Sequence, residues 1–344
     1  MQMYERVSSS TSTAPSAHGT GGEGGGRGVR LSVVVPVFNE QDVIRITHQR
    51  LCSVLAALGE PYEIVYVDDG SQDETPAILD EMAAAHPDVR VIHFSRNFGH
   101  QAAISAGIDH ARGDAVVVID ADLQDPPELI PRLVERWQAG YDVVYARRME
   151  RQGESWFKRS TARWFYRGLR RLADIPIPLD TGDFRLMDRR VCAVLRALPE
   201  HHRFLRGLVA WAGFRQIAVE YVREPRLAGT SKYSLRKMLR LAADAVTSFS
   251  YRPLRWPLYA GAGWTVATLA LMAGEAWRMS FAHHGISGAS LLITFSLLGD
   301  GVLLLSVGVL GQYVARIHDE ARRRPLYIVR EVVGGRPSAQ EGNR

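Results

Sequence analysis

The stretch AVVVIDADLQDPPELI, from Ala115 to Ile130, ends an apolar run in two carboxylates, Asp120 and Asp122. On an extended strand, residues i and i+2 point to the same side, so the two carboxylates repel each other unless a cation lies between them. Mg²⁺ or Mn²⁺ suits such oxygen ligands, which usually share the ion with phosphate oxygens. Gln124 returns to the same side and adds a carbonyl oxygen. These residues predict a site for a metal and a diphosphate, although a solvated helix start before PPELI also fits the pattern.

Two further strand ends carry groups of the kind that bind ligands. The segment VDDGS contains Asp69, and an acid there can accept hydrogen bonds from a base imide or a ribose hydroxyl. The segment PVFNE offers the ring of Phe38 and the carboxylate of Glu40. Three strand ends with such groups favour a nucleotide-binding edge over simple solvation of acids.

The elements that must position these residues alternate between strand and helix from Leu31 onward. Short β-branched runs such as LSVVVPVF are nearly continuous in apolar residues, and amphipathic segments such as NEQDVIRITHQRLCSVLAAL separate them. This pattern predicts a parallel sheet covered by helices on both faces. In such sheets ligands bind beyond the carboxyl ends of the strands, where the polar groups above would gather.

Composition separates the ends of the chain from this middle part. The 344 residues are 46% hydrophobic and 23% charged, with a net charge of +5 that indicates an anionic partner such as a membrane surface or phosphates. Cys52 and Cys192 are the two cysteines, which suits a reducing compartment and no disulfide or zinc site. Residues 1–29 are rich in Ser, Thr and Gly and have no apolar signal-peptide core, so we expect a disordered tail.

The last third of the chain carries membrane signals. Residues 257–278 and 290–314 are each long and apolar enough to span a bilayer, and basic residues flank the pair on its outer sides. The positive-inside rule then puts both ends in the cytoplasm; a buried-core reading is the alternative. Residues 231–256 predict an amphipathic helix in the headgroup layer, or else a packed surface helix. Residues 315–344 are expected to form a basic cytoplasmic tail.

Taken together, these motifs resemble family 2 glycosyltransferases with a GT-A fold. More narrowly, the chain resembles the polyprenyl-phosphate glycosyltransferases, which include dolichol-phosphate mannose synthases and bactoprenol glucosyltransferases. The resemblance covers roughly residues 31–325 and rests on these segments: VVVPVFNE, VDDGSQDET, SRNFGHQAAISAGIDHARGD, VIDADLQDPPELI, YDVVYARR, DTGDFRLMDRR, RFLRGLVAW and AGTSKYSLRKML. It implies a Rossmann-like, mostly parallel GT-A catalytic domain at 30–230, followed by the amphipathic helix and two transmembrane helices.

The resemblance also assigns roles to individual residues. It implies that the nucleotide-sugar binds to Pro36, Phe38, Glu40, Asp69, Asp120, Ala121 and Arg147. It implies that Mg²⁺ or Mn²⁺ is held by Asp120, Asp122 and Gln124. It implies catalytic roles for Asp122, Asp183, Arg226 and Lys232. It implies an acceptor-phosphate site made of Arg159, Arg163, Arg226 and Lys232. Phe38 stands where many relatives have Tyr, so a hydroxyl contact there is lost.

The expected reaction moves a sugar, with inversion, from a nucleotide donor, by analogy a UDP-hexose, to undecaprenyl or another polyprenyl phosphate. A lipid monophosphate is mostly dianionic at neutral pH and needs no strong general base. This fits a sequence in which no His–carboxylate pair is evident beside the acids of strand four. Asp183 then orients the sugar, with a role as base as the alternative.

The family implies a multi-pass protein of the bacterial inner membrane with a cytoplasmic catalytic domain, assembled as a homo-oligomer, by analogy a tetramer. A processive polysaccharide synthase is one alternative, but a QxxRW element and further spans are not evident in the sequence. A catalytically inactive, membrane-anchored scaffold that binds sugar nucleotides is another. A nucleic-acid binder would explain the positive charge but neither the acids nor the spans.

Overall fold

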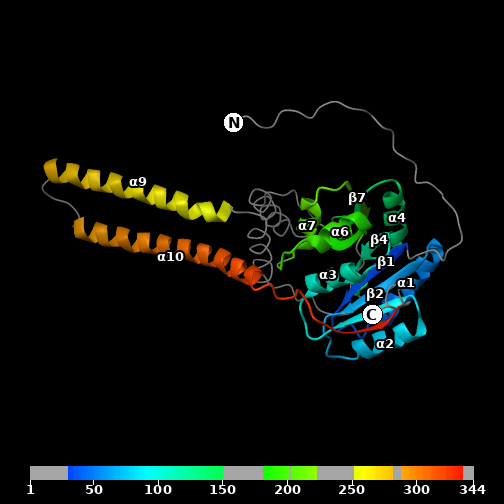
Figure 1. Ribbon diagram of the computed structural model, residues 1–344. Helices are drawn as coiled ribbons and strands as arrows, with labels where there is room; N and C mark the ends of the chain where they lie inside the picture. Colours follow the sequence, from blue (N-terminus) through cyan, green and yellow to red (C-terminus); the bar gives the residue numbers. More distant parts are fainter. Residues whose placement is uncertain (1–29, 150–180, 202, 223–251, 282–287, 336–344) are drawn as a thin grey trace.

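Strands and helices alternate along the first part of the chain, as the sequence predicts (Figure 1). The computed structural model describes residues 30–149, 181–201, 203–222, 252–281 and 288–335. The strands are β1 (Leu31–Val37), β2 (Tyr62–Asp68), β3 (Val89–Phe94), β4 (Ala115–Val118), β5 (Val143–Arg148), β6 (Thr181–Asp188), β7 (Gln216–Tyr221) and β8 (Val329–Gly334). The helices are α1 (Ile44–Leu58), α2 (Thr75–Ala85), α3 (His100–His110), the short η1 (Pro127–Leu129), α4 (Ile130–Gln138), α6 (Arg189–Ala197), α7 (Leu205–Trp211), α9 (Arg252–Phe281) and α10 (Gly288–Ala321).

The described strands form one mixed sheet in the order β7-β5-β6-β4-β1-β2-β3-β8. Strand β1 pairs in parallel with β2 and β4, β2 pairs in parallel with β3, and β5 with β7. Strands β6 and β8 run antiparallel to their neighbours. The expected α/β fold with a mostly parallel sheet is therefore confirmed, with two strands reversed.

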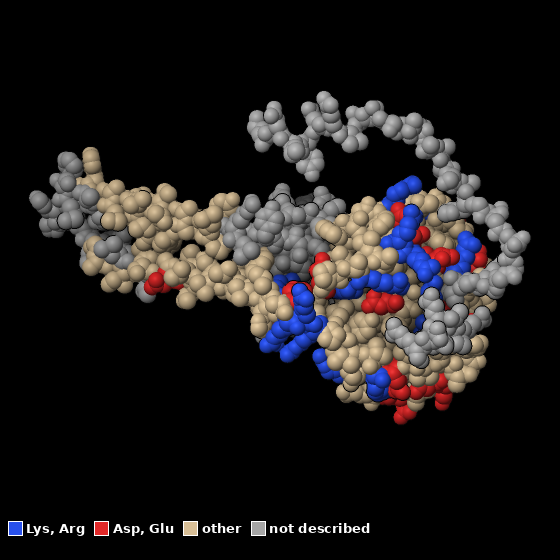
Figure 2. Space-filling model, viewed as in Figure 1, with Lys and Arg blue, Asp and Glu red and all other residues tan. Residues whose placement is uncertain are grey.

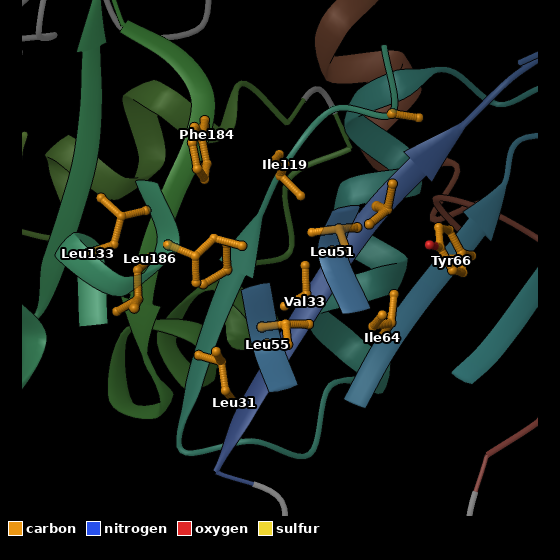
Figure 3. Close-up of a cluster of buried hydrophobic side chains, with 14 of the residues drawn as sticks. Leu31, Val33, Leu51, Leu55, Ile64, Tyr66, Ile119, Leu133, Phe184 and Leu186 are labelled. Carbon is orange, nitrogen blue, oxygen red and sulfur yellow. The ribbon is translucent and has the colours of Figure 1, made fainter. Parts of the chain in front are cut away.

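Helices cover both faces of the sheet because successive strand residues alternate between two apolar cores. Val33 and Val35 of β1 enter the core under α1, α2 and α4, together with Leu51 of α1 (Figure 3). Val34, between them, enters the core under α3, α6 and α7. The central strands are therefore buried on both faces of the sheet, which explains their β-branched runs without polar alternation.

Helix α3 lies especially close to the sheet, and a glycine permits it. A Cβ built on Gly107 would lie 2.1 Å from Cγ1 of Val34. Any side chain at 107 would therefore push α3 away from β1. The position of α3 matters because its first residue, His100, lies at the carboxyl edge of the sheet.

The C-terminal segment returns to the sheet, which the sequence did not predict. Residues 315–344 were expected to be a basic tail, yet they contain the end of α10 and strand β8, which pairs antiparallel with β3. The predicted domain range 30–230 therefore omits a strand. The cause is composition: VREVVG carries charges and reads weakly as a strand, because it is an exposed edge strand.

Helices α9 and α10 extend away from the α/β domain and pack side by side (Figure 1). The ring of Trp264 in α9 stacks on Phe295 in α10, with centroids 4.3 Å apart. Among the described residues, one stretch, Leu298–Ala321 within α10, is long and apolar enough to cross a membrane. The predicted spans 257–278 and 290–314 lie within α9 and α10, and two membrane crossings stay a prediction.

Several sequence predictions fall outside the described residues. They are the tail at 1–29, the amphipathic helix at 231–256 except for the start of α9, and the predicted phosphate-binding side chains Arg159, Arg163, Arg226 and Lys232. Predictions about these residues stay predictions.

Candidate active site

The carboxyl ends of the parallel strands meet the beginning of β6 at one edge of the sheet. Strand β6 runs antiparallel to β4, with Arg185 opposite Val118, so Asp183 lies level with the residues that follow β4. Asp120 is among these residues. The fold thus brings together two acids that are 63 positions apart in the sequence.

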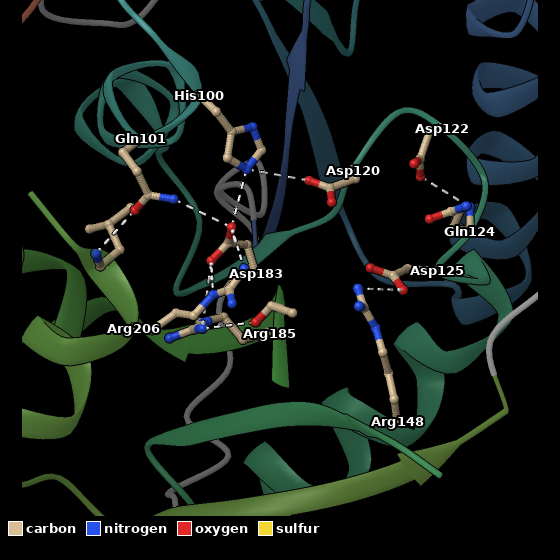
Figure 4. A network of polar contacts seen from close by, with 12 residues as sticks. His100, Gln101, Asp120, Asp122, Gln124, Asp125, Arg148, Asp183, Arg185 and Arg206 are labelled. Atoms are coloured by element: carbon tan, nitrogen blue, oxygen red, sulfur yellow. Dashed lines mark hydrogen bonds and ion pairs between the residues drawn. The ribbon is translucent and has the colours of Figure 1, made fainter. Parts of the chain in front are cut away.

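His100 lies between these two acids (Figure 4). Its Nε2 is 3.1 Å from Oδ2 of Asp183 and 3.6 Å from Oδ1 of Asp120. Burial would lower the pKa of His100, but the hydrogen bond to Asp183 and the charges of the two acids outweigh it and raise the pKa. The expectation that no His–carboxylate pair stands beside the acids was wrong. The imidazole belongs to SRNFGHQAA, which follows β3, but only the packing of α3 brings it to Asp120.

Asp183 is held from several sides and is almost buried, with 7% of its side chain exposed. Arg206 of α7 binds it through two donors, Nε to Oδ1 at 2.8 Å and Nη2 to Oδ2 at 3.2 Å. Arg185 approaches the same carboxylate at 3.9 Å. Burial alone would raise the pKa of Asp183, but the hydrogen bond from His100 and the charge of Arg206 hold the pKa far below its usual range.

These contacts bear on the role of Asp183. A carboxylate with so low a pKa is a poor proton acceptor at neutral pH. The geometry therefore favours an orienting role over a general-base role, although both stay predictions. Arg206 was not singled out from the sequence. Its segment RFLRGLVAW contains two arginines, and nothing in the spacing tells which one faces Asp183.

Asp120 has the surroundings of a cation ligand. Burial and then the charges of Asp183, Asp125 and Asp122 raise its pKa to about 6, against the opposing effect of His100. Its Oδ1 is buried and accepts no hydrogen bond within the described part of the chain, and the same holds for Oε1 of Gln124. Buried oxygens without donors are costly unless a cation or a ligand completes them.

The loop that carries the acids is a turn and not the extended strand that the sequence predicts. Strand β4 ends at Val118, and Leu123 has φ 56°, a left-handed conformation that is rare for leucine. Asp122 Oδ1 accepts a hydrogen bond from the backbone amide of Gln124 at 3.1 Å, while Asp120 points toward His100 (Figure 4). The assumption that i and i+2 point to one side was wrong, because pairing with β6 stops two residues too early.

The two acids that follow in the sequence have structural roles. Asp125 is fully buried, accepts a hydrogen bond from the hydroxyl of Tyr221, and lies 3.7 Å from Arg148. Glu128 is exposed and binds Arg50 of α1 at 2.7 Å. Arginines thus offset part of the negative charge that follows β4, and the loop is tied to β5, β7 and α1.

The loop after β1 meets the loop after β2. Asn39, with φ 54°, donates its amide to Ser71 Oγ at 3.0 Å, and its side chain accepts from the amide of Gln72 at 2.8 Å. Pro36 is buried at the end of β1, Phe38 is 43% exposed, and the amide of Glu40 donates to Thr75 Oγ1. An exposed ring at this edge is compatible with stacking on a base.

Asp69 is committed to the backbone of the neighbouring loop. Its carboxylate accepts from the amides of Phe98 at 2.7 Å and Gly99 at 3.0 Å. Gly70 beside it has φ +69°, and a Cβ there would lie 2.5 Å from the carbonyl carbon of Arg96, so the two loops touch at backbone level. If Asp69 binds the nucleotide as predicted, its carboxylate oxygens must accept hydrogen bonds from the nucleotide as well as from these two backbone amides.

The remaining predicted site residues lie nearby or outside the described chain. Arg147 pairs with Glu220 of β7, whereas the next residue, Arg148, turns toward Asp125. Ala121 contributes its backbone, with its carbonyl accepting from Thr47 Oγ1 at 2.7 Å. Among the described residues, no three His, Cys, Asp or Glu side chains converge to hold a metal by themselves.

Comparison with known proteins places this site in a family. The sequence profile of Glycosyl transferase family 2 matches residues 32–196. The uncharacterized glycosyltransferase YkcC of Bacillus subtilis is 52% identical over 90% of this chain and 95% of its own. The SfII prophage-derived bactoprenol glucosyl transferase of Shigella flexneri is 42% identical over 90% of this chain and 100% of its own.

Among solved structures, the mannosyltransferase PcManGT of Pyrobaculum calidifontis in complex with GDP-Man and Mn²⁺ matches 87% of this chain and 88% of its own, with 20% identity and a TM-score of 0.44. The two sequence relatives match about nine tenths of this chain and nearly all of their own length. The chain therefore belongs to glycosyl transferase family 2 and is a glycosyltransferase.

Proposed function

We propose that this enzyme transfers a hexose, glucose in the first instance, from a uridine diphosphate sugar to a polyprenyl phosphate such as undecaprenyl phosphate. The product is a polyprenyl-phosphate sugar at the cytoplasmic face of the bacterial inner membrane. Relatives named bactoprenol glucosyl transferases match about nine tenths of the chain, which supports both the donor sugar and the lipid acceptor.

One structural observation is the main support for an acceptor that lies in the membrane. Strand β8 begins at Val329, which pairs with Phe94 at the carboxyl end of β3. The chain that leaves α10 therefore enters the sheet at the same edge as Asp120 and His100. An apolar helix joined to the catalytic edge by a short connection is what an acceptor confined to a bilayer requires.

The surface of the helix pair supports insertion in a membrane. Large apolar side chains along it are more than half exposed, among them Leu258, Trp277, Leu304 and Leu305. Figure 2 shows few charged side chains on the visible face of the pair, whereas charges gather on the α/β domain and near the end of α10. So much exposed apolar surface is rare in a soluble monomer. We propose two spans, at 257–278 and 290–314, with both ends cytoplasmic.

Two residues after β4, Asp120 and Gln124, carry oxygens that suit a divalent cation. The buried Oδ1 of Asp120 and Oε1 of Gln124 lack donors within the described residues, and hard oxygen ligands suit Mg²⁺ or Mn²⁺. We propose that Asp120, Asp122 and Gln124 hold it together with the donor diphosphate. When bound, the ion would neutralise charge on the departing diphosphate.

The residues of the chain then supply positioning and charge. An acceptor phosphate oxygen forms a bond to the anomeric carbon, and the bond from that carbon to the diphosphate breaks with inversion. No proton has to move, because the acceptor is already mostly dianionic. Asp183, fixed by Arg206 and His100, would orient the sugar, while Phe38, Glu40 and Asp69 would line the nucleotide.

Beyond the described residues, we propose that Arg226 and Lys232, with Arg159 and Arg163, bind the acceptor phosphate. Arg147 would contact phosphate or sugar after exchange of its Glu220 partner. These basic side chains would offset the repulsion between two anionic phosphates.

Assembly as a tetramer also stays part of this proposal.

The test uses membranes that contain the full chain, undecaprenyl phosphate, Mn²⁺ and a panel of radiolabelled sugar nucleotides. We expect label from UDP-glucose to enter the lipid phase, dependent on added acceptor. Asp188→Asn is the control, since Asp188 lies at the far end of β6 and caps α6. If no sugar nucleotide labels the lipid phase, the proposal is wrong.

A further inference from the structure

The C-terminal segment 326–334, here called the strap, joins the membrane helix α10 to the catalytic sheet. We propose that the strap sets the height of the active-site edge relative to the bilayer, with Tyr327 as its positioning residue. This inference rests on the proposed lipid acceptor. It adds a role for a segment outside the site, which holds the active-site edge at the depth of the lipid acceptor.

Backbone pairing attaches the strap to β3. Residues Val329 to Gly334 pair antiparallel with Arg90 to Phe94, with an irregularity at the start of the strap. One step before β8, the amide of Ser95 donates to the carbonyl of Ile328 at 3.0 Å. This last bond reaches the loop between β3 and α3, whose last residue precedes His100.

Tyr327 fastens the beginning of the strap to the end of β3 and to α3. Its ring stacks on Phe94 with centroids 5.1 Å apart and planes at 13°, and its hydroxyl donates to Asp109 of α3 at 2.9 Å. Phe94 in turn meets Phe98 edge to face at 5.7 Å. The amide of Phe98 is one of the donors to Asp69. Aromatic contacts thus lead from the strap, through the end of β3, to the loop that precedes His100.

The connection from α10 to the strap is short. Seven residues, 322–328, separate Ala321 from Val329, and an extended chain of that length spans at most about 25 Å. Arg323 has φ 48°, and Pro325 restricts the chain further. The amide of His201 also donates to Glu320 Oε1 near the end of α10, at 2.8 Å. The sheet edge therefore cannot move far from the helix end.

A fixed height matters because the acceptor phosphate stays at the depth of the lipid headgroups. The active site must be presented at that depth, and small misplacement of reacting groups is costly in rate. A donor dissolved in water imposes no such requirement. Loosening the strap should therefore weaken use of a membrane-bound acceptor and spare use of a soluble one.

The first test compares Tyr327→Ala with Val332→Ala in the full-length protein. Val332 lies on the exposed part of β8 and is 48% exposed, so its truncation leaves the loop contacts intact. In vesicles that contain undecaprenyl phosphate, we expect Tyr327→Ala to raise the acceptor KM about tenfold with the donor KM unchanged. With a water-soluble short-chain prenyl phosphate in detergent, we expect turnover close to wild type for both variants.

The second test keeps every contact of Tyr327 and lengthens the connection. Four residues, Gly-Ser-Gly-Ser, are inserted between Arg324 and Pro325. We expect this variant to melt like wild type and to use the soluble acceptor normally, but to lose about tenfold in kcat/KM with the vesicle acceptor. This variant keeps the inference testable even if Tyr327→Ala fails to fold.

The outcomes separate the two proposals. Wild-type use of the vesicle acceptor by the insertion variant would overturn the role of the strap and leave the proposed reaction intact. Equal losses with soluble and membrane acceptors would also overturn it, because they would indicate damage to the site itself. If wild-type protein used neither acceptor with any donor, the proposed function would fail instead.

Discussion

Asp183→Asn separates an orienting role of Asp183 from a general-base role. The wild-type carboxylate binds Arg206 through two donors and His100 through one, with 7% of its side chain exposed. Asparagine keeps the shape but removes the charge that Arg206 and Arg185 face. Removing one partner of a buried ion pair costs about 3–5 kcal/mol. Because Arg206 is 32% exposed and regains water, we expect the free energy of unfolding to fall by about 2–3 kcal/mol.

The kinetic consequence follows from the depressed pKa. The carboxylate stays ionised through the working pH range, so it stabilises the fold above its unfolded pKa of about 4 and loses this effect only in more acidic solution. We therefore expect Asp183→Asn to lower kcat/KM for the donor about 100-fold with the pH profile unchanged in shape. Asp188→Asn, on the same strand, is the matched control.

The assay measures initial rates of lipid labelling from about pH 5.5 to 9, with thermal melting in parallel. Should Asp183→Asn abolish the acidic limb of the profile while the melting temperature stays at the wild-type value, Asp183 would be the base. That result would overturn the orienting role of Asp183.

Three further predictions test other parts of the structure. His93 lies fully buried between Asp68 and Asp80. Burial opposes its positive charge, but the hydrogen bonds and charges of both acids raise its pKa. The protonated ring therefore stabilises the fold below about pH 6.5, and this stabilisation is lost as the pH rises through the pKa of folded His93. His93→Gln should flatten the fall in melting temperature as the pH rises above about 6.5. A melting temperature that falls with pH as steeply as in the wild type would count against a charged His93 between Asp68 and Asp80. Glu128→Gln should cost about 0.5–1 kcal/mol in chemical unfolding, since its ion pair is exposed, and leave transfer rates intact; a large loss of transfer would give this acid a role in the site. His100→Leu should lower kcat/KM for the donor about tenfold or more, while His100→Gln, which keeps a donor, should retain most of it; equal losses would point to packing alone.

Much of the fold could be predicted because its signals are local. The valine run of β1 reflects a strand that is buried on both faces of the sheet. Parallel pairing of β1 with β2 and β4 puts Asp120 at the edge where the carboxyl ends of these strands meet. Strand β8 could not be found this way. Its residues are exposed and partly charged, and its partner β3 lies more than 200 positions earlier.

The site was predicted by residue type more successfully than by contact. The resemblance singles out both Asp120 and Asp183, but the sequence does not show that His100 lies between them. It also does not show that Asp69 binds backbone amides. Such contacts depend on how α3 packs against the sheet, and a packing arrangement leaves no periodic trace in the sequence.

The mass of the lipid product tests directly whether this enzyme transfers a hexose to polyprenyl phosphate. Vesicles with full-length protein, undecaprenyl phosphate, UDP-glucose and Mn²⁺ are extracted with organic solvent and analysed by mass spectrometry, beside the same vesicles with Asp122→Asn. We expect a lipid phosphate carrying one hexose with the wild-type enzyme and none with the variant. A polymer of sugars, free glucose alone, or wild-type yield from Asp122→Asn would contradict it.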